Sequence, residues 1–315
     1  MPLRTSKKSA KSGKLSGQLP VSSAIRASGL LLPPGTVLMG IETTITEIVR
    51  PTDRLVMVVG AYGSGKTEIS VNLAVAVAAT GRKVQVADLD IVNPYFRCRE
   101  ARLLMEQYDI RVVVPPGAQE YADLPIVLPE IAGMLQPPEG VLSLFDVGGD
   151  EVGARVLASL RPRFVDGQYE LWQVINSRRP FTGTVQGCLN MLREMELASR
   201  LQVTGLLVNS HLIEETTPDV VLEGWNLARE VAEKSGLPVR CVAAMEHLAD
   251  APEIAGIEAP LLRLQRHMLP PWKKSLVGAE PSDDRSETLP AAGPTPIGVP
   301  PKLRLVKPGG GTDGQ

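Results

Sequence analysis

Aromatic residues, cysteines and long apolar runs are all scarce in this chain of 315 residues. Aromatic residues make up 4% of it, although its hydrophobic share of 43% and charged share of 22% are ordinary for a globular protein. The three cysteines, Cys98, Cys188 and Cys241, lie far apart without a C-x-x-C pair, which excludes a disulfide framework and a cysteine zinc cluster. No run approaches the roughly 18 apolar residues of a membrane span, and no signal-peptide core is present, so we expect a cytoplasmic protein.

Acidic residues are absent from the first 41 positions, which carry six basic ones: Arg4, Lys7, Lys8, Lys11, Lys14 and Arg26. We interpret residues 1–36 as a basic disordered arm; the alternatives are a segment that contacts nucleic acid or an anionic membrane, and a transit peptide. Residues 270–315 contain nine prolines and seven glycines and are expected to form a disordered tail. Residues 37–269 are therefore predicted to be the folded domain, which is acidic, because residues 42–269 carry a net charge of -9.

Short apolar runs alternate with helical patterns through this folded part. Strands are expected at residues 55–59, 84–87, 111–114, 141–145, 172–175, 205–208 and 239–243. Helices are expected at residues 68–80, 96–108 and 183–201, and from Thr217 onward, where Pro218 suits the first helical position. Residues 37–50 are compatible with a strand or a short helix. This alternation predicts an α/β fold in three layers, a mainly parallel sheet with helices on both faces and ligands at the carboxyl ends of the strands.

A glycine-rich segment follows the first predicted strand and matches the phosphate-binding pattern G-x-x-x-x-G-K-S/T. Its glycines let successive N–H groups point toward phosphate oxygens at the positive end of the next helix. Lys66 is expected to reach the β- and γ-phosphates, and the Thr67 hydroxyl to ligate Mg²⁺. A glycine-rich turn that happens to precede a lysine is the alternative. The predicted nucleotide-binding residues are Gly60, Ala61, Tyr62, Gly63, Ser64, Gly65, Lys66 and Thr67.

Carboxylates follow two further predicted strands. Asp88 and Asp90 close the second strand, where they are placed to hold a Mg²⁺-bound water or to orient the attacking water; an acidic cap on a surface turn is the alternative. Asp146 ends another strand at the position expected of a carboxylate that supports Mg²⁺. The nearby Gly149 would let a backbone N–H approach the γ-phosphate and move when that phosphate leaves. The alternative is an ordinary strand-to-helix loop in which Asp150 caps the helix.

In this order and spacing, the three motifs resemble the MinD/ParA/CobQ-like branch of the SIMIBI class of P-loop NTPases, over residues 55–245. The resemblance implies that Asp88 or Asp90 assists attack by water and that Asp146 supports Mg²⁺. It also implies that Asn209, which follows the strand at residues 205–208, contacts adenine. The family's signature lysine, which reaches across a nucleotide-sandwich dimer, falls at the position of Ala61. An ATP-driven sandwich homodimer is therefore not expected.

These residues favour a Mg²⁺-dependent ATPase whose nucleotide state acts as a switch on an unidentified protein partner. A small-molecule kinase or ligase that uses the same loop, and a nucleotide-binding scaffold with little hydrolysis, are the alternatives. ATP is favoured over GTP because the chain has no N-K-x-D motif.

Weaker signals lie outside these motifs. Arg178 and Arg179 follow a predicted strand, where they would either place a cation near phosphate or a partner, or remain solvated. His211, His247 and His267 lack metal-ligand spacing and are expected to be structural or surface residues. The cysteines are expected to be small core residues.

Overall fold

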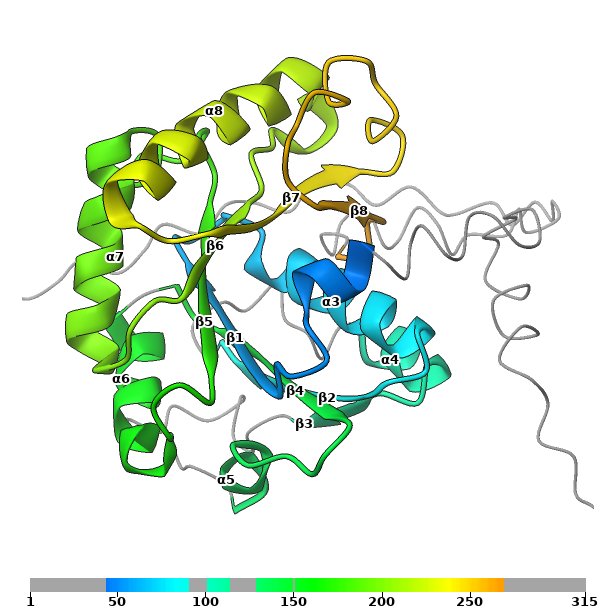
Figure 1. The fold of residues 1–315 in the computed structure, drawn as a ribbon. Coiled ribbons are helices and arrows are strands. Elements are labelled where there is room, and N and C mark those ends of the chain that lie inside the picture. The colour runs from blue at the N-terminus through cyan, green and yellow to red at the C-terminus, as the bar shows by residue number, and fades with distance from the viewer. Residues whose placement is uncertain (1–43, 91–100, 114–128, 150, 269–315) are drawn as a thin grey trace, which may run out of the picture.

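The computed structural model describes residues 44–90, 101–113, 129–149 and 151–268 (Figure 1). The predicted arm and tail, Asp150 and Cys98 lie outside these ranges, so the proposed domain boundaries remain predictions. None of the described helices is both long enough and apolar enough to cross a lipid bilayer.

Among the described residues, eight parallel strands form one sheet, in the order β3-β2-β4-β1-β5-β6-β7-β8. The strands are β1 (Leu55–Gly60), β2 (Lys83–Leu89), β3 (Arg111–Val113), β4 (Val141–Val147), β5 (Glu170–Ile175), β6 (Gly205–Val208), β7 (Val239–Met245) and β8 (Leu261–Leu264). Because all pairs are parallel, the carboxyl ends of the strands lie at one edge of the sheet. The loop after β1 therefore emerges between the ends of β4 and β5, where the strand order reverses and ligands bind in such sheets.

Helices cover both faces of the sheet, which confirms the predicted three-layer α/β/α fold (Figure 1). One face carries α3 (Lys66–Ala79), α4 (Arg102–Gln107) and the helical residues 44–48. The other face carries α5 (Pro129–Met134), α6 (Glu151–Leu160), α7 (Val185–Ser199) and α8 (Pro218–Ser235). The short 3-10 turns η2 (Arg161–Arg163) and η3 (Ile213–Glu215) follow α6 and β6.

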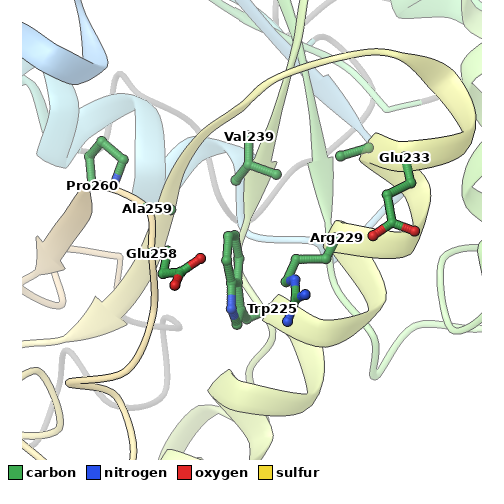
Figure 2. Close-up of a pocket in the computed structure, with 8 residues that line it drawn as sticks. Trp225, Arg229, Glu233, Val239, Glu258, Ala259 and Pro260 are labelled. Atoms are coloured by element: carbon green, nitrogen blue, oxygen red, sulfur yellow. The ribbon is translucent and has the colours of Figure 1, made fainter.

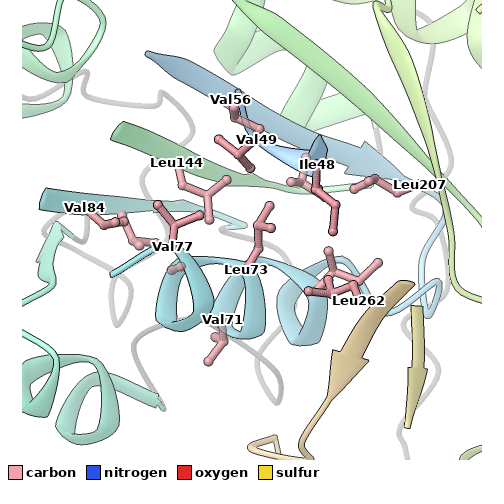
Figure 3. Packing of buried hydrophobic residues seen from close by; sticks show 14 of the residues in the cluster. Ile48, Val49, Val56, Val71, Leu73, Val77, Val84, Leu144, Leu207 and Leu262 are labelled. Carbon is pink, nitrogen blue, oxygen red and sulfur yellow. The ribbon is translucent and has the colours of Figure 1, made fainter. Parts of the chain in front are cut away.

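Helix α3, which follows the glycine-rich loop, is buried in the hydrophobic core on the face of the sheet that it shares with α4 (Figure 3). Leu73 and Val77 of α3 pack with Leu144 of β4 and Leu262 of β8, and Leu73 is fully buried. Burial of a leucine side chain contributes about 1.5–3 kcal/mol to folding. The core therefore fixes α3, and with it the loop that begins the helix.

Some elements differ from the sequence expectation. The segment compatible with a strand or a helix is helical at residues 44–48, because Ile45 and Ile48 pack into the core beneath α3. Strand β8 and helix α5 were not predicted, since they are only 4 and 6 residues long and too short for a clear period. The helix expected at residues 96–108 is described only from residue 101, and its helical residues end at Gln107.

Four residues after β8, which we call the C-terminal strap (residues 265–268), lie along the start of α3. Asn72 exchanges two hydrogen bonds with the backbone of Gln265, of 2.8 and 2.9 Å. The Glu68 carboxylate accepts the backbone N–H groups of His267 and Met268 at 2.7 and 3.1 Å. Burial raises the pKa of Glu68, and these hydrogen bonds oppose that shift. The strap is therefore tied to the residue that directly follows Thr67.

Candidate functional site

The glycine-rich segment forms a loop between β1 and α3, as predicted, and we call residues 60–67 the phosphate loop. Gly65 is the N-cap of α3 with φ of 86°, a left-handed conformation that favours glycine. A Cβ at this position would collide with Nδ2 of Asn209. Both the backbone angle and the close approach therefore require glycine here.

The lysine of the loop is held close to its own backbone. Lys66 is 5% exposed, and its Nζ donates to the carbonyl of Ala61 at 3.2 Å. Gly149, in the loop after β4, approaches the same place: a Cβ there would collide with the Gly60 carbonyl and lie 2.7 Å from Nζ of Lys66. The loop after β4 (residues 148–149) thus rests on the phosphate loop beside its cation.

Thr67 is joined to Asp146 at the end of β4. The Thr67 hydroxyl donates to one carboxylate oxygen at 2.7 Å, and the Ser70 hydroxyl donates to the other at 3.4 Å. Asp146 is fully buried. Hydroxyl and carboxylate oxygens are the ligands that Mg²⁺ prefers, alongside phosphate oxygens of a substrate. The residues present therefore fit the predicted magnesium site.

Asp88 lies beside Asp146, because the two are partners in the register of β2 and β4. Along β2, Val84 and Val86 face the core around α3, so strand alternation places Asp88 on that same face. Asp88 accepts the backbone N–H of Asp90 at 3.1 Å. Asp88 and Asp90 are 1% and 5% exposed, so they do not form an acidic cap on a surface turn. In the part of the chain that the structure describes, His, Cys, Asp and Glu side chains form no metal-binding cluster of three or more.

Asn209 follows β6 and is bound to the phosphate loop. Its Nδ2 donates to the Ser64 carbonyl at 2.9 Å, and the residue is 4% exposed. The predicted adenine contact of Asn209 remains a prediction. Tyr62, by contrast, projects from the loop and is 69% exposed.

The two arginines after β5 have separate surroundings. Arg178 forms an ion pair with Glu223 of α8. The Nε of Arg179 donates to the Gly63 carbonyl of the phosphate loop at 2.7 Å. From the sequence alone, both arginines have the same possible roles, whereas in the structure Arg179 contacts the loop and Arg178 pairs with α8.

His211, which the sequence indicated to be a structural or surface residue, also lies in this region. Its Nε2 is buried and would lie 3.2 Å from a Cβ on Gly65. Burial, together with the charges of Arg179 and Arg266, lowers the pKa of His211 to about 4. No local pattern marks this histidine, because only the adjacency of β5 and β6 to the phosphate loop brings it there. Cys188 and Cys241 are buried in the core, as predicted, and burial raises the pKa of each to about 12.

A hollow of about 330 Å³ lies near the amino ends of β7 and β8, away from the carboxyl ends that carry the phosphate loop (Figure 2). Val239 begins β7 and Pro260 precedes β8, so the hollow is beside the amino ends of these strands. None of the phosphate-loop residues lines it. Its lining residues are Trp225, Arg229, Ala232, Glu233, Val239, Glu258, Ala259 and Pro260.

Three solved structures illustrate what the chain is similar to in shape. The signal recognition particle receptor FtsY from Elizabethkingia anophelis, in complex with GDP, matches with a TM-score of 0.41 at 18% identity, over 63% of each chain. FtsY from Thermotoga maritima has a TM-score of 0.42 at 19% identity, over 70% of this chain and 72% of that one. The signal recognition particle 54 kDa protein from Aeropyrum pernix, in complex with GDP, has a TM-score of 0.40 at 18% identity, over 70% and 52%. The chain thus spans less than two thirds of the length of some of these proteins.

No curated protein matches the sequence. The model of the CobQ/CobB/MinD/ParA nucleotide-binding domain matches residues 55–223, more than half of the 315 residues. The matched region begins with β1 and contains the phosphate loop, Asp88, Asp146 and Asn209. The chain belongs to the family of CobQ/CobB/MinD/ParA nucleotide-binding domains.

Proposed function

We propose that the protein is a Mg²⁺-dependent ATPase whose nucleotide state acts as a switch on a protein partner. The observation that supports this most directly is the contact between Gly149 and the phosphate loop. Gly149 lies against the Gly60 carbonyl and beside Nζ of Lys66, the cation that would bind the terminal phosphates. The loop after β4 can therefore respond to what Lys66 holds, and a partner that contacts this loop would detect the change.

The roles of the residues follow from their contacts. The N–H groups of the phosphate loop and the Lys66 ammonium would bind the phosphates, while Thr67 and Asp146 would hold Mg²⁺. When bound, Mg²⁺ neutralises charge on the transferred phosphate. Asp88 or Asp90 would orient the attacking water, and the hydrogen bond from the Asp90 backbone fixes the Asp88 carboxylate.

The choice of ATP over GTP rests on the segment after β6. Asn209 there is followed by Ser210, His211 and Leu212, so the aspartate that pairs with guanine in an N-K-x-D motif is missing. ATP is the nucleotide to test first, and GTP is the comparison.

Phosphate release from ATP, with and without Mg²⁺ and with GTP in parallel, tests this function. We expect Mg²⁺-dependent release from ATP and at least about tenfold weaker ATP binding by Lys66→Ala, because a charge-assisted contact is lost. Lys83→Ala is the matched control, since Lys83 is an exposed lysine at the start of β2. Equal ATP affinity in calorimetry for Lys66→Ala and the wild type would show that the loop does not bind phosphate.

A further inference from the structure

Charge is distributed unequally on the two sides of the phosphate loop. The side toward β4 and β2 carries the buried carboxylates Asp88 and Asp146. The side toward β5 and β6 carries Arg179, whose charge, with that of Arg266, acts on His211. A polyphosphate with a bound metal has a matching asymmetry, because the metal suits carboxylates and the remaining phosphate charge suits cations.

Arg179 is a cation that contacts the loop on this second side. Its guanidinium lies against Gly63: a Cβ there would be 3.2 Å from Nε, 3.3 Å from Cζ and 3.5 Å from Nη2. Nε is used by the Gly63 carbonyl, which leaves the remaining N–H groups for another acceptor. Among the described residues, no carboxylate forms an ion pair with Arg179. Arg178 and Arg266, by contrast, pair with Glu223 and Glu214.

A second, independent observation marks the same side as a place for a ligand. Three buried polar atoms at the ends of β5 and β6 lack a hydrogen-bond partner: Nδ2 of Asn176, Oγ of Ser177 and Nε2 of His211. Buried polar atoms are rarely left unpaired in a folded protein, and a catalytic role or a bound ion is among the reasons when they are. The region beside Arg179 therefore offers polar groups that the protein itself does not satisfy.

We propose that Arg179 is a second phosphate-binding cation, which the chain supplies to the polyphosphate of its own nucleotide. The proposal rests on the proposed nucleotide binding. In the family that the sequence resembles, the additional cation is a lysine that reaches across from the partner subunit. Here that position is Ala61, which is 1% exposed and carries no charge. Arg179 places a charge beside the phosphate loop within one subunit, so binding of the triphosphate needs no partner subunit.

The alternative role for Arg179 is purely structural, since its hydrogen bond to Gly63 would also hold the loop in shape. The two roles differ in how they depend on the ligand. An electrostatic contact gains with each added phosphate, whereas a loop-shaping contact affects ATP, ADP and AMP to a similar extent. The ratio of affinities across the three nucleotides therefore separates them.

Calorimetric titration of the full chain with ATP, ADP and AMP, each with Mg²⁺, tests the proposal. We expect Arg179→Gln to bind ATP about tenfold more weakly, ADP less so and AMP unchanged, because a charge-assisted contact to phosphate is lost. Arg179→Lys keeps the charge and should recover most of the ATP affinity, and it also serves as the test if Arg179→Gln does not fold. Arg178→Gln is the matched control, because Arg178 is adjacent in sequence but pairs with Glu223, and it should bind all three nucleotides like the wild type.

An equal loss for all three nucleotides in Arg179→Gln, or no loss at all, would overturn the proposal. The same holds if Arg178→Gln shows the same losses as Arg179→Gln. A wild-type chain that binds ATP without hydrolysing it would contradict the proposed ATPase function and leave this test intact. A wild-type chain that binds none of the nucleotides would overturn both.

NMR titration of His211 gives a readout without nucleotide. The pKa of His211 is about 4, in part because of the Arg179 charge, and should rise in Arg179→Gln.

Discussion

At the residue scale, the hydrogen bond between Thr67 and Asp146 links the predicted metal ligand to a fully buried carboxylate. Asp146→Asn keeps the size of the side chain and one acceptor oxygen but removes the charge. We therefore expect hydrolysis to need about tenfold more Mg²⁺, the factor that outer-shell partners of a metal usually contribute. Asp88→Asn, in contrast, should leave ATP bound and mainly slow hydrolysis. Phosphate release measured against Mg²⁺ concentration distinguishes the two, with the exposed Asp166→Asn as control; an unchanged Mg²⁺ requirement in Asp146→Asn would contradict the assignment.

Also at the residue scale, the lowered pKa of His211 predicts that the stability of the fold depends on pH. The pKa of His211 is lowered from 6.5 to about 4, so between these values the unfolded chain binds more protons than the folded one. The contribution of His211 to the free energy of unfolding is therefore fully present above pH 6.5. It decreases as the pH falls toward 4, by at most about 3 kcal/mol. Glu68, whose pKa burial raises, acts in the opposite direction. Urea unfolding of the wild type and of His211→Gln at pH 7 and 4.5 isolates the histidine; equal losses on acidification in the two chains would contradict its role.

At the scale of the element, the strands with continuous apolar runs and the helix that follows Thr217 and Pro218 could be predicted from the sequence. Thr217 is the N-cap of α8 with Pro218 in its first turn, as expected, although the Thr217 side chain makes no capping hydrogen bond. The C-terminal strap could not be predicted. Its register against α3 depends on Glu68 and Asn72, which lie almost 200 residues earlier in the chain and look like ordinary polar residues of a helix start.

The strap gives a prediction about where the fold ends. A chain that ends at Met268 loses none of the described contacts and should match the stability of the full chain within about 0.5 kcal/mol. A chain that ends at Leu264 loses the buried Met268 and leaves the Glu68 carboxylate and Asn72 without their backbone partners. We expect it to be less stable by about 3 kcal/mol or more. Urea unfolding of both chains is the measurement, and equal midpoints would show that the strap does not stabilise the fold.

At the scale of the whole molecule, the side of the site that carries Asp88 and Asp146 could be predicted because its residues lie in three motifs at strand ends. The opposite side could be predicted only in part: the sequence marked Arg178 and Arg179 as possible cations near phosphate, but Arg179 lies 116 residues beyond the glycine whose carbonyl it binds. Its place depends on the strand order, in which β5 lies next to β1 and β6 follows. A sequence pattern indicates that strands are parallel but does not give that order, so it could not show which of the two arginines reaches the loop or that His211 lies beside it.

The strand order and the charge together predict the state of assembly. A sandwich dimer of the family type would bring two phosphate loops face to face, yet Ala61 is buried, uncharged and unable to reach a second nucleotide. Residues 42–269 carry a net charge of -9, so two such faces repel at close approach, although salt screens this repulsion beyond roughly 10 Å. We therefore expect ATP with Mg²⁺ to leave the chain monomeric, or to leave any existing dimer unchanged. Light scattering of Asp90→Asn, chosen to slow hydrolysis, is the measurement. A shift from monomer to dimer on adding ATP, which persists when Arg178 and Arg179 are both replaced, would show that another surface closes the dimer.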